Sequence, residues 1–359
     1  MRAARVMVAM SGGVDSSVAA ARLVEQGHEV VGVTMKLWGG ESDTGCCSVS
    51  DVDDARRVAQ QLGIPHHVWT FTDDFDQRVV QPYVEAHRTG HTPNPCIECN
   101  RHLKFDRMLL RAQAVGFDTV ATGHHARIVE LPDGSGRGGR RLALARGADR
   151  AKDQSYVLYV LGQEQLARTL LPVGDLTKAE VRAEAERLGL RTAAKPDSQD
   201  VCFITSSAGR AGFLSKRLDL HPADVVDAAG APVGTVEAVE LVTVGQRRGL
   251  GLSGGMATRY VTEVDVPARR VRVGPPQDLQ LTELALETMV WPAGRVEGDV
   301  TAQSSAHGAP RPARLTPDPD HPTRAVVRFA DPHRRVAAGQ SVVLYDPTGD
   351  HVVAGGIVA

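Results

Sequence analysis

A run near the N-terminus, Ser11-Gly12-Gly13-Val14-Asp15-Ser16-Ser17, combines backbone freedom with hydroxyl donors. It lies between a short apolar segment and a segment with helical spacing. The two glycines let the backbone turn tightly and approach a ligand closely. The start of a helix presents unpaired N–H groups and the positive end of the helix dipole. The loop is therefore predicted to bind a multiply charged phosphate group.

This loop differs from two well-known nucleotide-binding loops. A Walker A loop needs a lysine after its second glycine, and the dinucleotide fingerprint needs Gly-x-Gly-x-x-Gly. The string here resembles instead the Ser-Gly-Gly-x-Asp-Ser PP-loop of the ATP pyrophosphatase superfamily. That resemblance implies cleavage of ATP between the α and β phosphates and transfer of AMP, with Asp15 helping to organise Mg²⁺. The alternative is an ordinary Gly-Ser turn with a helix cap.

The cysteines are the second set of residues that could do chemistry. Five cysteines, an odd number in 359 residues, favour thiols, ligands or redox centres over a disulfide framework. Cys96-x2-Cys99 lies in the turn-rich segment Thr92–Asn100, before a predicted helix at 101–115. Cys99 is thus expected close to a helix N-terminus, where the dipole favours thiolate. The residue types alone fit a redox pair, half of a zinc site or part of an iron–sulfur site.

The other cysteines are less distinctive by themselves. Cys202 stands in a second string, Asp197–Ile204, which follows Lys195-Pro196 and is predicted to be a loop. The alternative for Cys202 is a buried core cysteine. Cys46 and Cys47 are adjacent, and we expect them to be structural.

The elements that must position these residues alternate between strand and helix in the first third of the chain. Such alternation predicts a doubly wound, parallel α/β sheet. A capping box at Thr177–Glu180 opens a helix that is predicted to end near Gly189, and the Gly- and Arg-rich stretch 131–141 is predicted to be a surface hairpin loop. Predicted strands are 5–10, 29–35, 68–71 and 119–123, and predicted helices include 14–26 and 51–62.

After about residue 205 the pattern becomes rich in Pro, Gly and Val and predicts all-β structure, a small central domain followed by a barrel. The Pro-rich stretch 310–322 is predicted to be an exposed loop. We therefore expect three domains, 1–204, 205–280 and 281–359. Alternating segments that predict strands are 260–266, 270–273, 324–329, 341–345 and 352–358.

The composition is that of an ordinary globular protein, with 42% hydrophobic and 23% charged residues. The formal net charge of -2 provides no global attraction for a polyanion, so a nucleic-acid partner would need a local basic patch. The N-terminal apolar run is too short for a signal peptide, and no run is long enough to span a membrane. The expectation is a cytoplasmic protein with no membrane partner.

Taken together, the motifs closely resemble those of the bacterial tRNA-specific 2-thiouridylases, which place sulfur on C2 of the wobble uridine. The resemblance runs almost end to end. It implies a PP-loop, adenine nucleotide alpha hydrolase-like catalytic domain at the N-terminus and a C-terminal barrel that contacts tRNA. The segments that carry it are Ser11–Ser17, Thr34–Lys36, Thr92–Asn100, Thr122–His124, Lys152–Tyr156, Asp197–Ile204 and Val244–Leu250.

The resemblance implies a role for each matching position. Cys99 matches the nucleophile and Cys202 the cysteine that carries persulfide sulfur. The target base would meet Asn94, Pro95 and Cys96. ATP would be bound by Ala9, Met10, Ser11, Gly12, Gly13, Val14, Asp15, Ser16, Met35 and Gly123. Contacts to tRNA are implied for His124, Lys152, Asp153, Gln154, Arg328, Phe329 and Gln340, and Arg247 and Arg248 are further candidates for phosphate contacts.

One departure from the family pattern concerns Cys96, which stands where the family commonly has an aspartate, a candidate general acid or base. Either the proton is handled elsewhere or Cys96 has a new role. Thiolates of Cys96, Cys99 and Cys202 could hold a [4Fe–4S] cluster with one open iron. The cofactors implied are therefore ATP and Mg²⁺, with such a cluster as an alternative.

The implied reaction adenylates the C2 oxygen of uridine-34, releases pyrophosphate, and then replaces AMP by sulfur. A cysteine desulfurase or a sulfur-relay protein would load Cys202, and the tRNA substrates would be the Lys, Glu and Gln types. Cys99 would either attack the persulfide to release sulfide or close a disulfide with Cys202. Rival hypotheses are a PP-loop synthetase or ligase for a small molecule, an RNA-binding protein with a decayed ATP site, and a thiolase for another tRNA position.

Overall fold

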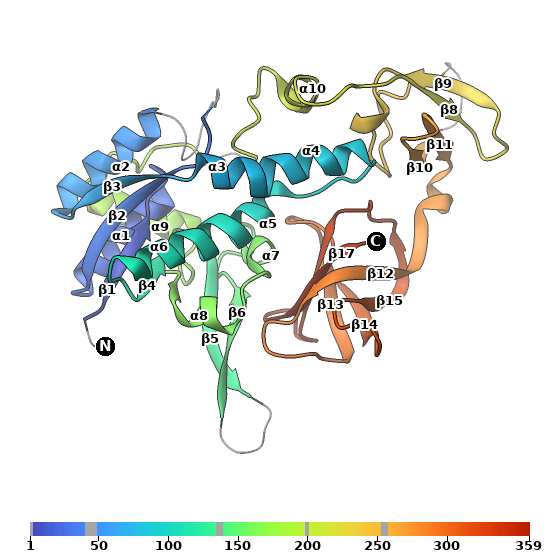
Figure 1. Cartoon of the computed structure of the whole chain (residues 1–359). Helices are drawn as coiled ribbons and strands as arrows, with labels where there is room; N and C mark the ends of the chain where they lie inside the picture. The colour runs from blue at the N-terminus through green and yellow to red at the C-terminus, as the bar shows by residue number, and fades with distance from the viewer. Residues whose placement is uncertain (1–2, 40–48, 134–138, 198–200, 253–257) are drawn as a thin grey trace.

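The computed structural model describes residues 3–39, 49–133, 139–197, 201–252 and 258–359. The N-terminal α/β domain, a small central β-sheet and a C-terminal barrel follow one another along the chain (Figure 1). The predicted fold class is thereby confirmed. Cys46 and Cys47 lie outside the described residues.

The N-terminal sheet has the strand order β3-β2-β1-β4-β7, and every pair is parallel. Its central strands β1, β2 and β4 are largely buried on both faces, as expected for a parallel sheet, whereas the edge strand β3 is partly exposed. Val6 and Val8 of β1 pack with helices α1, α2 and α9, whereas Met7 packs with the helical segments on the other face. The strands are β1 (Arg5–Ala9), β2 (Glu29–Lys36), β3 (His66–Thr70), β4 (Thr119–Ala121) and β7 (Thr169–Leu170), and the first-named helices are α1 (Val14–Glu25), α2 (Val49–Leu62) and α9 (Lys178–Arg187).

Two long helical runs cover the second face of this sheet. The first consists of α3 (Thr72–Phe75), η1 (Asp76–Val80) and α4 (Gln81–Arg88), and α4 reaches toward the central sheet (Figure 1). The second consists of α5 (Pro95–Cys99), η2 (Asn100–Arg107) and α6 (Met108–Ala114).

The predicted start of this second helix, Arg101, was wrong, because the helix begins at Pro95. Proline suits the first helical position, since its fixed φ is helical and the N–H that it lacks would have no partner there. The Asn94 side chain caps the helix by accepting a hydrogen bond from the Cys96 amide at 3.0 Å.

Beyond these runs the chain forms a hairpin and a capped helix. Strands β5 (Ala126–Pro132) and β6 (Arg140–Arg146) pair antiparallel and flank the hairpin loop predicted at 131–141, of which residues 134–138 lie outside the described residues. Thr177 caps α9 with the predicted capping box, and Gly189 follows the helix with φ +62°. Two short helices complete the domain, α7 (Ser155–Leu158) and α8 (Gln163–Ala167).

The central part is a four-stranded sheet of order β10-β11-β8-β9. The prediction of all-β structure missed the helix α10 (Gly209–Leu214), which precedes the sheet and buries Phe213 and Leu214. Two short helical turns belong to this part: η3 (Val239–Leu241) lies between β9 and β10 in the chain, and η4 (Pro276–Leu279) follows β11. The strands are β8 (Ala223–Val226), β9 (Pro232–Val236), β10 (Tyr260–Asp265) and β11 (Arg270–Gly274).

The C-terminal part is a closed barrel of order β12-β15-β14-β13-β16-β17. The prediction of an exposed loop at 310–322 was wrong, because residues 311–317 form strand β14, which pairs with β13 and β15. Ala313 and Leu315 point into the barrel core, while Pro312 and Pro317 lie near the strand ends, where a missing N–H costs few ladder bonds. The strands are β12 (Gln280–Val290), β13 (Gly298–Gln303), β14 (Arg311–Pro317), β15 (Ala325–Arg334), β16 (Ser341–Tyr345) and β17 (Val352–Val358).

The barrel shares a hydrophobic core with the N-terminal domain, in which Tyr156 and Tyr159 lie with Tyr345. The Tyr156 hydroxyl donates to the Ser341 carbonyl at 2.8 Å. A Cβ on Gly355 would lie 2.3 Å from the Tyr159 ring, so strand β17 approaches as closely as glycine allows. No helix in the described part of the chain is long and apolar enough to cross a membrane.

Candidate active site

The loop predicted to bind phosphate, Ser11–Ser17 (the phosphate loop below), connects β1 to α1 at the carboxyl end of the sheet, where ligands bind in open α/β folds. Gly12 has φ +77°, and a Cβ there would lie 2.2 Å from the Asp51 carbonyl oxygen. The Gly13 carbonyl accepts hydrogen bonds from the hydroxyls of Ser16 (3.1 Å) and Ser17 (2.8 Å). These bonds close the turn from within.

Gly123 follows β4, beside the same helix start. A Cβ on Gly123 would lie 2.5 Å from the Ser16 nitrogen and 2.6 Å from the Asp15 carbonyl carbon. Met35 lies buried near the end of β2. The structure thus gathers the loop, Met35 and Gly123, all predicted to bind nucleotide, at the ends of three adjacent strands.

Asp15 bonds side chains from two other segments of the chain. Its carboxylate accepts hydrogen bonds from Lys178 Nζ at 2.7 and 2.8 Å and contacts His125 Nε2 at 3.1 Å. Burial alone would raise the pKa of Asp15, but the hydrogen bonds from His125 and Lys178 outweigh it and lower that pKa. Asp15 is therefore a carboxylate at neutral pH, and Mg²⁺ would have to share its oxygens with Lys178.

A second lysine, Lys195, contacts the loop backbone. Lys195 Nζ donates to the Gly12 carbonyl at 3.0 Å and to Asp54 at 2.7 Å, and it also bonds Asp51. Burial lowers the pKa of Lys195, yet the bonds to Asp51 and Asp54 more than compensate, and the pKa lies above its usual value.

Sequence reasoning assigned no site role to Lys178, Lys195 or His125. Lys178 was visible only as part of a capping box and Lys195 only as the residue before a proline. Lysines on separate elements carry no spacing signal, and only the fold brings them to the loop.

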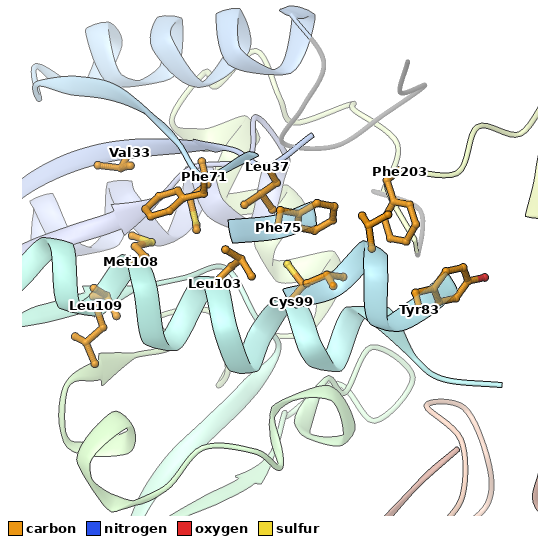
Figure 2. Packing of buried hydrophobic residues seen from close by; sticks show 14 of the residues in the cluster. Val33, Leu37, Phe71, Phe75, Tyr83, Cys99, Leu103, Met108, Leu109 and Phe203 are labelled. Atoms are coloured by element: carbon orange, nitrogen blue, oxygen red, sulfur yellow. The ribbon is translucent and has the colours of Figure 1, made fainter. Parts of the chain in front are cut away.

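The structure brings the predicted cysteines into one region, although about a hundred positions separate Cys202 from Cys96 and Cys99. Cys99 is buried within the hydrophobic cluster of the second sheet face, and Cys202 packs against the same cluster. Figure 2 shows Cys99 on its helix near Phe75 and Phe203. The Val201 amide donates to Cys96 Sγ at 3.5 Å, which ties the Cys202 segment to the start of α5.

The early start of this helix changes the electrostatic argument for the cysteines. Cys96 is the second helical residue, and Cys99 lies a turn further along. The dipole effect falls off within the first turn, so the stabilisation of thiolate expected for Cys99 applies more strongly to Cys96. Among the described residues, no group of three or more His, Cys, Asp or Glu side chains is placed to hold a metal ion.

The segment Lys152–Gln154, predicted to contact tRNA, is bonded mainly to the protein itself. Lys152 is exposed and donates to Asp197 at 2.8 Å. Asp153 is buried and pairs with Arg146 at 2.7 Å. The Gln154 side chain accepts a bond from the His125 amide at 2.9 Å.

The other residues predicted to contact tRNA differ widely in exposure. His124 is buried, burial lowers its pKa, and its ring contacts the Thr122 hydroxyl at 2.7 Å. Arg328 is exposed on β15 and pairs with Glu283 at 2.7 Å, whereas the neighbouring Phe329 is buried. Arg247 and Arg248 are also exposed.

The barrel holds the segment that precedes Cys96. The Gln340 side-chain amide donates to the Thr92 carbonyl, and the Thr92 amide donates to the Ala338 carbonyl at 2.9 Å. Of the predicted tRNA-contacting residues, Gln340 is thus directly linked to the segment predicted to meet the base.

Family models match nearly the whole chain. The model described as "tRNA methyl transferase HUP domain" matches residues 4–206, "tRNA methyl transferase PRC-barrel domain" matches 211–275, and "Aminomethyltransferase beta-barrel domain" matches 281–358.

Curated relatives match over almost their full length. They are named as thiouridylases, whereas the family models are described as transferases of methyl or aminomethyl groups. The tRNA-specific 2-thiouridylase MnmA of Mycobacteroides abscessus is 47% identical and covers 99% of both chains. The MnmA of Roseiflexus castenholzii is 44% identical over the same shares. Among solved structures, the U34-tRNA thiolase NcsA from Methanococcus maripaludis with its [4Fe-4S] cluster matches at 20% identity and TM-score 0.36, over 55% of this chain and 61% of that one.

Proposed function

The chain belongs to the tRNA-specific 2-thiouridylase family, and we propose that it uses ATP to place sulfur on C2 of uridine-34 in tRNA. The observation that carries this is the joint presence of a glycine-lined phosphate loop and a region that gathers Cys96, Cys99 and Cys202. A small-molecule synthetase would need the loop but not the cysteines.

In the adenylation step the C2 oxygen of the uracil attacks the α phosphorus of ATP, and pyrophosphate leaves. Backbone N–H groups at the start of α1 stabilise the negative charge that develops on the leaving group. Lys178 and Lys195 already contact the loop and add positive charge there. When bound, Mg²⁺ would supply further charge neutralisation, with Asp15 as the loop carboxylate available to it.

In the sulfur-transfer step the terminal sulfur of a Cys202 persulfide attacks C2, and AMP leaves with the former C2 oxygen. The Cys99 thiolate then attacks the Cys202 sulfur, which forms a disulfide and leaves 2-thiouridine. In the other order, Cys99 attacks the persulfide first and releases sulfide, which attacks C2. Both routes end with a Cys99–Cys202 disulfide, which a thiol reductant must reopen.

Cys96 receives a positioning role in this proposal. Its sulfur accepts the Val201 amide next to Cys202, and its own amide is capped by Asn94. A Cys96→Ser variant is expected to retain thiolation at reduced rate. The [4Fe–4S] alternative finds no donor set of three cysteines among the described residues. We therefore expect thiolation without stoichiometric iron after anaerobic purification and reconstitution.

The sulfur source and the substrate set follow from the family resemblance. We propose that a cysteine desulfurase or a sulfur-relay protein loads Cys202, and that the substrates are tRNAs of the Lys, Glu and Gln types. We propose further that the protein acts in the cytoplasm.

The decisive experiment incubates the protein with bulk tRNA, ATP, Mg²⁺ and a persulfide donor and analyses the nucleosides by mass spectrometry. 2-Thiouridine is expected with the wild type and is expected to be absent with Cys99→Ser and Cys202→Ser, which should still bind ATP. Normal thiolation by Cys202→Ser would disprove its assignment as the sulfur carrier. ATP–pyrophosphate exchange with and without tRNA separates this enzyme from a small-molecule synthetase, because exchange should depend on tRNA here.

A further inference from the structure

The motif Cys96-x2-Cys99 has the spacing of a redox pair, yet the proposed transfer step oxidises only Cys99 and Cys202. None of these three described cysteines forms a disulfide in the structure. Cys96 is therefore a third thiol at the site, and the contacts around it indicate what its sulfur can do.

Cys96 and Cys99 lie on one helical turn whose geometry suits a disulfide. Both belong to α5, in a helical run that continues through η2 and α6. Residues three apart on a helix are neighbours on one face, and their Cα atoms lie about 5 Å apart. A disulfide spans that separation. Closing this pair therefore needs rotation of two side chains rather than movement of the helix.

The same turn is held by contacts at its start and between the cysteines. The Asn94 side chain accepts a hydrogen bond from the Cys96 amide at 3.0 Å. The carboxylate of Glu98 lies 3.4 Å from the Arg101 guanidinium and 3.2 Å from the His102 ring. These contacts fix the backbone that carries the two thiols.

The backbone next to Cys202 contacts the Cys96 sulfur. The amide of Val201, the residue just before Cys202, donates to Cys96 Sγ at 3.5 Å. An N–H donor stabilises negative charge on its acceptor, and the thiolate is the form that attacks a disulfide. Cys202 packs against the hydrophobic cluster that contains Cys99. Cys96 thus lies beside the two residues that the transfer step joins in a disulfide.

The three thiols differ in their access to solvent. Cys99 is only 8% exposed and lies among apolar side chains (Figure 2), whereas Cys96 and Cys202 have intermediate exposure. An external thiol that attacks a Cys99–Cys202 disulfide therefore reaches the sulfur of Cys202 more easily, and the resulting mixed disulfide occupies the sulfur carrier itself. A Cys96–Cys99 disulfide offers the sulfur of Cys96 instead and leaves Cys202 as a thiol.

We propose that Cys96 is a resolving cysteine, whose thiolate attacks the Cys99 sulfur of the Cys99–Cys202 disulfide. The Cys96–Cys99 bond forms, the Cys99–Cys202 bond breaks, and the Cys202 thiolate leaves with the electron pair, so no net oxidation occurs. Cys202 can then accept the next persulfide sulfur. An external dithiol reduces the Cys96–Cys99 disulfide afterwards and is itself oxidised. The inference rests on the proposed function for the formation of the Cys99–Cys202 disulfide.

The first test needs no tRNA and maps where a disulfide settles in the full chain. The wild type is oxidised with a limiting amount of diamide, the remaining thiols are alkylated with iodoacetamide, and tryptic peptides are analysed by mass spectrometry. Cys96 and Cys99 share the tryptic peptide 89–101, whereas Cys202 lies in 192–210. A closed loop within the first peptide, with Cys202 alkylated, is expected. A cross-link between the two peptides, with Cys96 alkylated, would overturn the proposal.

The second test follows thiolation by protein that is loaded with persulfide and freed of excess donor. Without reductant, wild-type Cys202 should return to a thiol as 2-thiouridine forms. Cys96→Ser keeps an acceptor for the Val201 amide, so its first turnover should be as fast, but Cys202 should stay cross-linked to Cys99. With a micromolar dithiol reductant, repeated turnover of the variant should be about 100-fold slower, because an intramolecular thiol acts at a millimolar effective concentration.

Glu98→Gln is the matched control, because it changes the same turn and keeps all three thiols. It should show the wild-type disulfide map and turnover. Repeated turnover of Cys96→Ser at the wild-type rate would refute the resolving role. A slow first turnover followed by normal reopening would assign the effect to positioning and also refute it.

Failure of this inference is distinct from failure of the proposed function. Wild-type protein that forms 2-thiouridine while Cys96 remains alkylatable throughout refutes the exchange alone. Wild-type protein that forms no 2-thiouridine disproves the proposed function, on which the exchange rests. The peptide map of oxidised wild type decides the matter if Cys96→Ser does not fold.

Discussion

The phosphate loop and the cysteine region are positioned by different kinds of contact. Contacts between neighbouring residues shape the loop, whereas contacts between segments far apart in the chain form the cysteine region. The loop is a run of consecutive residues whose hydroxyls bond its own Gly13 carbonyl, and its shape follows from two glycines between a strand and a helix. The cysteine region joins Cys96 and Cys99 to a segment about a hundred residues further along the chain. The barrel contacts the segment just before Cys96, because the Gln340 side chain donates to the Thr92 carbonyl. The turn η3 of the central part contacts helix α4 through His87.

This difference indicates how the two half-reactions should fail. A change inside the loop should abolish ATP binding and leave the rest of the fold intact. A change at a distant domain contact should impair sulfur transfer while the loop still binds ATP.

The largest expected effect comes from the contact that docks the barrel. Buried Arg146 bonds Asp153 at 2.7 Å, Gln303 at 2.7 Å and the Gly349 carbonyl at 2.7 Å. Asp153→Ala leaves a buried guanidinium without its counter-charge and should cost about 3–5 kcal/mol of stability. Urea denaturation measures this loss, and calorimetry should show ATP binding retained under native conditions.

The matched control is Asp350→Ala at the same interface. Asp350 bonds Arg127 and Arg150 but its side chain is 25% exposed, so its loss should cost less than about 1 kcal/mol. Equal destabilisation by the two variants would show that the buried pair has no special part in docking.

The second effect is a pH dependence that arises from the contact between α4 and the central part. His87 Nδ1 donates to the Glu240 carbonyl at 3.1 Å, and burial lowers the His87 pKa from 6.5 to about 4. Because the unfolded chain takes up the proton first, stability should fall as pH drops from 6.5 to 4. The difference corresponds to at most about 3 kcal/mol.

Urea midpoints measured across this pH range should decline more steeply for the wild type than for His87→Gln, which retains a donor without the titration. Parallel profiles of the two proteins would contradict the assignment to His87.

The third effect is confined to the loop. Gly12→Ala places a Cβ against the Asp51 carbonyl and strains a left-handed backbone, so ATP-dependent thiolation should fall by about 100-fold. Gly27→Ala is the matched control, because Gly27 has φ +79° beyond the other end of α1 and a Cβ there meets nothing within 4 Å. Kinetics of both variants separate crowding at the site from backbone strain alone, and similar losses would point to strain.

The smallest effect is expected on the exposed face of the barrel. Arg328 and Glu283 form an ion pair with side chains 61% and 50% exposed, so Arg328→Ala should change stability by less than about 1 kcal/mol. If Arg328 contacts a tRNA phosphate, the affinity of Arg328→Ala for tRNA should fall. The slope of log affinity against log salt concentration should decrease by about one. Arg314→Ala, an exposed arginine on β14, provides the control, and equal affinities for the two variants would argue against a specific contact.

Local patterns predicted the fold class and many element positions correctly. The strand–loop–helix unit at the N-terminus, the capped helix α9 and the bounds of β16 and β17 all follow from periodicity and capping residues. The errors at Pro95 and at β14 share one cause. Proline signals a break in a pattern, but the fold decides whether that break is a helix start, a strand end or a loop.

The sequence by itself located the loop Ser11–Ser17 and the pair Cys96-x2-Cys99, because adjacent residues and fixed short spacings define them, but it left more than one kind of site open for the cysteines. Only the tertiary structure placed Lys178 between Asp15 and Asp197, moved Cys96 into the first turn of its helix and buried Asp153 against Arg146. These are contacts between residues far apart in the chain. Packing of the sheet, its helices and the barrel brings their charges together, and no pattern along the sequence encodes the resulting distances.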